Sequence, residues 1–189
     1  MLASPLTLDR SRRTARVDHP LLLWSIRLAL LGYFGALALL LSPRWPQGWR
    51  MARALWTGGC LLYVVHVMAA FHFAHGWRHA AAYEHTAQQT AAFTGFAWGG
   101  GLWLNHLFTA VWAADVLAWW LRPLAYLDRP RWLTLSIHTW LAFITFNATV
   151  VFGQGLVRWL SAAAWLGVAA LAWAKVRSNV SVQGEGKRG

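Results

Sequence analysis

The chain has 189 residues, of which 58% are hydrophobic and only 12% are charged. Soluble domains carry roughly 25% charged residues, so this composition excludes an ordinary soluble domain and indicates a membrane protein whose surroundings are the lipid bilayer. The net charge of +11 does not indicate a nucleic-acid partner, because the basic residues form short clusters between apolar runs, as they do beside membrane helices.

The chain begins with a polar, basic segment over residues 1–19 that contains four arginines. The first apolar run, residues 20–41, reads PLLLWSIRLALLGYFGALALLL and is long enough to cross a bilayer. No clean cleavage site follows it, so we expect a retained helix rather than a signal peptide. Arg27 lies within this run, and a charge at membrane depth either pairs with an opposite charge, such as Asp115, or extends to the headgroups.

The second apolar run covers residues 54–76 and leads into a stretch of helix-forming residues. Residues 78–93, RHAAAYEHTAQQTAAF, contain no glycine or proline. They predict a short amphipathic helix that either continues the second helix past the membrane surface or bends along that surface. The glycines at 99–101 then end it and open the third apolar run.

Three further runs, residues 101–121, 132–153 and 156–176, complete the pattern, and Gly153 and Gly155 favour a tight turn between the last two. The sequence thus predicts an all-α integral membrane protein, a bundle of about five transmembrane helices over residues 20–177, followed by a disordered tail over residues 178–189. Counting lysine and arginine near the helix ends favours a cytoplasmic C-terminus, and we expect a multi-pass protein of the cell inner membrane.

Histidines gather where the second run ends, in the stretch HFAHGWRHAAAYEHT. On one continuous helix, His72, His75 and His79 would share a face, a spacing that suits ligands of one metal ion or of a haem iron. His106, near the start of the third run, is expected at the same membrane surface. Single histidines at helix ends are more often ordinary interfacial residues. The candidate metal ligands are His72, His75 and His79, and the candidate cofactor ligands are His72, His75, His106 and His138.

A second set of polar residues lies near the opposite surface. Asp115 shares a helix face with Phe108, Trp112 and Trp119, which predicts a packed face. His138 lies at a similar depth, so a carboxylate–imidazole pair is possible there. The expected buried charge partners are Asp115 and Arg27.

Three functions fit these residues. The first is a b-type haem or transition-metal-binding subunit of a membrane redox system, and possible cofactors are therefore haem b or a transition metal. The second is a non-catalytic subunit or assembly protein that contacts other membrane subunits. The third is a metal-dependent membrane hydroxylase or oxidase; His75 and His79 fit one histidine box of such enzymes (HxxxH), but nothing fits the second box (HxxHH). The sequence identifies no catalytic residue.

Overall fold

A computed structural model describes residues 19–42 and 48–185, with side chains as far as residue 178. Within these residues the protein consists of helices and short connections, without a strand. Four segments are long and apolar enough to cross a membrane: Pro20–Leu41, Gly48–Ala74, Arg131–Val151 and Gly155–Ser178. The prediction of an all-helical protein with several helices able to cross a membrane is confirmed. The fifth span, over residues 101–121, stays a prediction. The basic segment over residues 1–18 lies outside the described residues.

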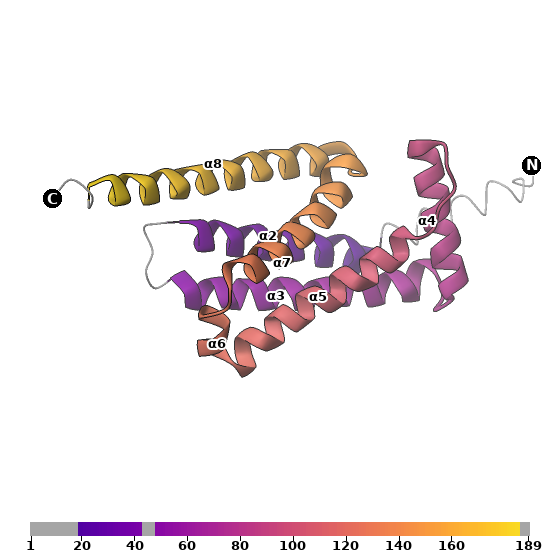
Figure 1. Cartoon of the computed structure of the whole chain (residues 1–189). Helices are drawn as coiled ribbons and strands as arrows, with labels where there is room; N and C mark the ends of the chain where they lie inside the picture. Colours follow the sequence, from indigo (N-terminus) through magenta and orange to yellow (C-terminus); the bar gives the residue numbers. More distant parts are fainter. Residues whose placement is uncertain (1–18, 43–47, 186–189) are drawn as a thin grey trace, which may run out of the picture.

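Helices α2 (Pro20–Leu41) and α3 (Gly48–Ala69) lie side by side along the length of the molecule (Figure 1). Their contact is lined by small residues, because a Cβ atom on Gly32 would lie 2.9 Å from both the Gly59 Cα and the Leu55 carbonyl oxygen. Small residues let membrane helices approach closely enough for backbone atoms to pack. The remaining buried small residues of this contact are Ser25, Ala29 and Ala36 on α2 and Ala52 and Cys60 on α3.

The second span ends in a π-helical turn, η1 (Ala70–Ala74), and then in a sharp bend before α4 (His79–Thr94). Gly76 and Trp77 both adopt positive φ, 55° and 60°, and the Trp77 N–H donates to the Phe71 carbonyl at 2.8 Å. Of the two alternatives for this region, the bend is therefore the correct one. In Figure 1, α4 lies across the end of the bundle, as a helix at a membrane surface would.

Helix α5 (Gly101–Leu121) crosses α3 at an angle and leads through the short α6 (Pro123–Leu127) to α7 (Arg131–Phe146) (Figure 1). The predicted packed face of α5 is confirmed, because Phe108, Trp112, Asp115 and Trp119 are all buried. These rings pack on Trp56 and Tyr33 to form the core between α2, α3 and α5. The polar residues of α5 therefore point into protein rather than into lipid.

The last span begins after a second π-helical turn, η2 (Asn147–Val151), and a short turn at residues 152–154. Gly155 adopts a φ of 56°, which agrees with the tight turn expected there. Helix α8 (Gly155–Glu185) then runs back along α2, where Lys175 Nζ donates to the Leu40 carbonyl at 2.8 Å. The helical backbone continues to Glu185, beyond residue 178, and the disorder expected for the tail stays a prediction.

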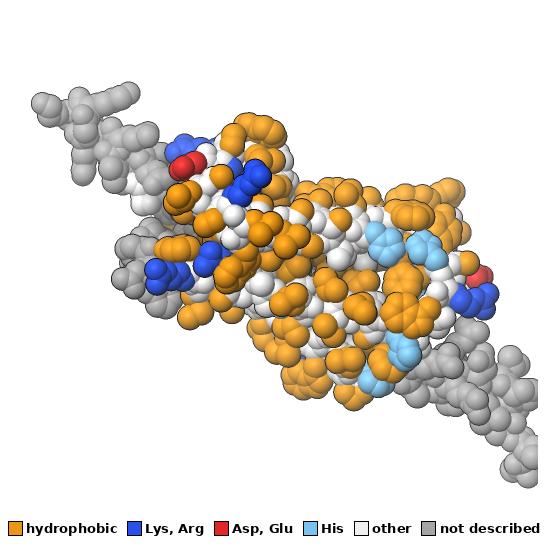
Figure 2. Space-filling view, turned by 90° about the horizontal axis from the view of Figure 1, so that it is seen from below, with side chains coloured by type: hydrophobic (Ala, Val, Ile, Leu, Met, Phe, Trp, Pro, Cys, Tyr) orange, Lys and Arg blue, Asp and Glu red, His pale blue; other side chains and the backbone are white. Residues whose placement is uncertain are grey.

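The two ends of the molecule differ in their polar residues (Figure 2). On the face that Figure 2 shows, histidines lie at one end, lysines and arginines cluster mainly at the other end, and the surface between them is largely apolar. A bilayer accommodates such a surface, because hydrocarbon contacts the sides and water contacts the ends. We call the first end the histidine end and the second the basic end.

Candidate functional site

Two histidines from different helices meet at the histidine end. His79 is the first residue of α4 and His106 lies in the second turn of α5, and their Nε2 atoms are 3.3 Å apart. The Trp103 ring lies 4.9 Å from the His79 ring, and the Phe71 ring stacks near His106 at 5.8 Å between centroids. The bend before α4 produces this pair, because it turns α4 back toward α5.

The other two predicted ligands at this end have different neighbours. Trp77 Nε1 donates to His72 Nδ1 at 3.1 Å, and the His75 ring lies 5.4 Å from the His85 ring. The expectation that His72, His75 and His79 share one helix face is therefore wrong, because the chain is not one continuous helix through His79. The π-helical turn changes the residue spacing, and the positive φ values of Gly76 and Trp77 break the helix before His79.

His75 lies close enough to His85 for their charges to interact. Partial burial lowers the pKa of His75, and the proximity of His85 lowers it further. We expect the His75 titration midpoint to rise in a His85→Ala variant, because the second positive charge is removed. A ¹⁵N NMR titration of histidine-labelled protein measures this midpoint. An unchanged midpoint would mean that the two imidazoles do not interact.

His66 and His138 are half-buried and lie apart from these pairs. His66 Nδ1 lies 3.0 Å from the Leu22 carbonyl oxygen and 3.4 Å from Ser25 Oγ, contacts that join α3 to α2. His138 on α7 packs against Trp56 at 5.2 Å between ring centroids, and its Nδ1 is buried without a hydrogen-bond partner among the described residues. Trp56 thus contacts both His138 and Asp115, but no hydrogen bond between these two residues is present in the described part of the chain.

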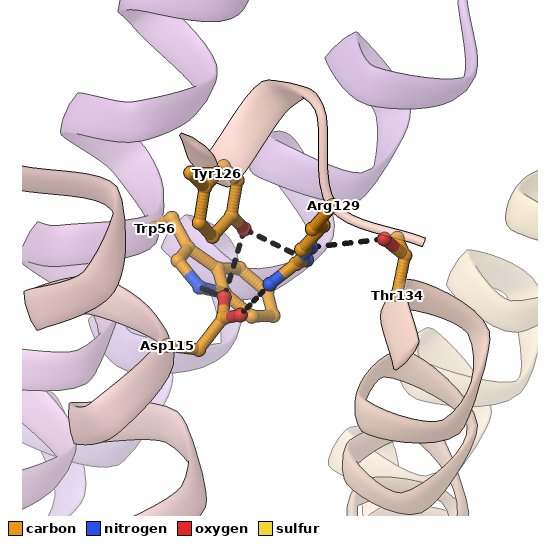
Figure 3. Close-up of polar contacts among 5 residues, drawn as sticks. All are labelled: Trp56, Asp115, Tyr126, Arg129 and Thr134. Atoms are coloured by element: carbon orange, nitrogen blue, oxygen red, sulfur yellow. Dashed lines mark hydrogen bonds and ion pairs between the residues drawn. The ribbon is translucent and has the colours of Figure 1, made fainter. Parts of the chain in front are cut away.

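Asp115 is the centre of a polar network toward the basic end (Figure 3). Its Oδ2 accepts from Trp56 Nε1 and from the Tyr126 hydroxyl, each at 2.9 Å, and its Oδ1 accepts from Arg129 Nη1 at 2.5 Å. Arg129 also donates from Nε to Thr134 Oγ1 at 2.9 Å. The network connects α3, α5, α6 and α7, and it leaves each Asp115 oxygen with a donor.

Arg129 replaces Arg27 as the expected partner of Asp115. Arg27 is exposed on α2, where its guanidinium lies 5.4 Å from the Trp24 ring centroid, and its extension to the headgroups stays a prediction. Arg129 lies in the connection between α6 and α7, in one of the short basic clusters between the apolar runs. Burial first, and then the Asp115 carboxylate, raise the pKa of Tyr126, so its hydroxyl stays protonated and can donate.

Within the described residues, no group of three or more histidine, cysteine, aspartate or glutamate side chains is arranged to hold a metal ion. The predicted set His72, His75 and His79 is therefore not brought together as a three-ligand site. Comparison of the chain with protein-family models, with curated proteins and with solved structures finds no match.

Proposed function

We propose that this multi-pass membrane protein binds a single transition metal ion between His79 and His106 at one membrane surface. The observation that supports this is the 3.3 Å separation of the two Nε2 atoms. Two imidazole nitrogens bound to one tetrahedral Zn²⁺ at about 2.0–2.1 Å lie roughly 3.3–3.4 Å apart. This agreement in distance supports the proposal that both side chains bind the same ion.

The same geometry favours a bare ion over haem b. Axial ligands on opposite faces of a haem iron lie about 4 Å apart, with the macrocycle between them. Here the Phe71 ring lies 6.1 Å from the His79 ring and 5.8 Å from the His106 ring. Together with Trp103 it occupies space around the pair where a macrocycle would extend.

Two protein ligands leave the other positions of the ion open. His79 begins α4 and His106 lies in the second turn of α5, and since His79 is exposed, water or a small molecule can reach the site. Open positions are typical of catalytic or transfer sites rather than of closed structural sites. The protein would therefore act as a metal-handling membrane subunit, a role that includes redox or transfer chemistry with a partner.

The experiment is metal binding to protein purified in detergent and stripped with a chelator. Titration with Zn²⁺ and with Cu²⁺ should give one ion per chain, and His79→Ala and His106→Ala should each weaken binding about 100-fold or more. Loss of a residue that only hydrogen-bonds to a metal ligand lowers metal affinity roughly 10–100-fold, so loss of a ligand itself should lower the affinity at least as much.

His85→Ala is the matched control, because His85 is an exposed histidine on the same helix that does not touch the pair. It should bind like the parent protein. Equal binding by all variants would show that His79 and His106 are only hydrogen-bonded to each other. A Soret band in the purified protein that His106→Ala removes would instead favour haem.

A further inference from the structure

A pocket of about 410 Å³ lies between α5 and α7 toward the basic end. One wall is a single face of α5, formed by residues spaced three, four and seven apart: Val111, Ala114, Asp115, Ala118 and Arg122. The other walls come from α7 and from the α6 connection, with Leu133, Ile137, Ala125, Tyr126 and Arg129. Ala114 and Ala118 create the space, since larger side chains at these positions would fill it.

The length and lining of the pocket suit an acyl chain. From Val111 to Arg122, directly after the end of α5, this wall extends over eleven residue steps, which is about 16 Å at 1.5 Å per residue. Ala114 and Ala118 are exposed, so this wall opens to the surroundings of the protein and is not packed in the core. Those surroundings are lipid where α5 crosses the bilayer, as its sequence predicts. A lipid chain is the occupant with the right shape and polarity for an apolar groove open to a bilayer.

The charges at the pocket favour one class of headgroup. Asp115 and Arg129 neutralise each other within their ion pair. Arg122, at the surface end of the groove, is exposed, and its side chain makes no ion pair or hydrogen bond with the described residues. One unpaired positive charge therefore remains at the mouth, where the headgroup of a lipid lying in the groove would be.

We propose that this groove is a binding site for an anionic phospholipid, with one acyl chain between α5 and α7 and the phosphate on Arg122. The site is at the opposite end of the bundle from His79 and His106, so it is independent of the metal proposal. A bound lipid would cover Asp115, Tyr126 and Arg129, which line the pocket. It would thereby exclude water from the Arg129–Asp115 ion pair.

The test is lipid binding to the full chain by native mass spectrometry, with phosphatidylglycerol and phosphatidylcholine of the same acyl chains as probes. The parent protein should prefer phosphatidylglycerol. Arg122→Gln should reduce this preference about fivefold, the effect of roughly one arginine on an anionic lipid. Ala118→Leu should weaken binding of both lipids, because the leucine fills the groove that either acyl chain would occupy.

Two controls separate the site from general effects of charge and bulk. Arg158→Gln removes an exposed arginine near the histidine end, and Gly167→Leu adds bulk on α8 where no atom lies within 4 Å; neither should change lipid binding. An unchanged lipid preference in Arg122→Gln would overturn the proposal. Displacement of phosphatidylglycerol by millimolar inorganic phosphate would also overturn it, because the site would then recognise a soluble anion.

Discussion

Replacement of Arg129 by glutamine should destabilise the protein by about 3–5 kcal/mol, the usual cost of leaving a buried charge without its partner. The Asp115 side chain is fully buried and that of Arg129 is 10% exposed, so the substitution would leave the buried carboxyl group with only Trp56 and Tyr126 as donors. Unfolding of the detergent-purified protein by heat or by SDS, followed by circular dichroism, measures the loss.

The matched substitution in the other residue of the ion pair, Asp115→Asn, should reduce the stability of the protein less than Arg129→Gln does. Asp115→Asn removes the buried negative charge and keeps an oxygen that accepts from Trp56 or Tyr126, and Arg129 retains some access to the surface. The double variant should be more stable than the sum of the two single losses predicts, because each residue's cost depends on the other's charge. Strictly additive losses would show that the ion pair makes no net contribution.

Replacement of Gly32 by leucine should also have a large effect, through the contact between α2 and α3. Even the first carbon of the new side chain would lie 2.9 Å from backbone atoms of Gly59 and Leu55, so the helices would have to separate. Overpacking of this kind costs typically 1–3 kcal/mol, and here the obstacle is backbone that cannot change rotamer. Gly32→Ala should already lower the unfolding temperature.

The control for this prediction is Gly58, which precedes Gly59 on α3. A Cβ atom on Gly58 would have no neighbour within 4 Å, so Gly58→Ala should leave stability unchanged or raise it by up to about 1 kcal/mol through helix propensity. If Gly32→Ala and Gly58→Ala behaved alike, the close approach of α2 and α3 would not be the source of the effect.

The helices themselves could be predicted from the sequence because they depend on local properties. Apolar runs about 20 residues long define the spans, and the spacing of Phe108, Trp112, Asp115 and Trp119 defines a buried face of α5 that the structure confirms. For the segment after the second span, the sequence predicts two alternatives, a continued helix or a bend along the surface, and the structure has the bend, at Gly76 and Trp77. Charge counting separated the basic end from the histidine end, since lysine and arginine favour headgroup positions over hydrocarbon.

Which polar residues meet could be decided only by the tertiary structure. His106 contacts His79 rather than His72 or His75, because a π-helical turn and two residues with positive φ redirect the chain before α4. Asp115 pairs with Arg129, which lies fourteen residues along the chain in the connection between α5 and α7. Helical periodicity gives the direction of a side chain within one helix, whereas a contact between helices depends on their rotation, depth and bends. Those quantities are set by packing such as the Gly32–Gly59 contact, which involves residues distant in the sequence.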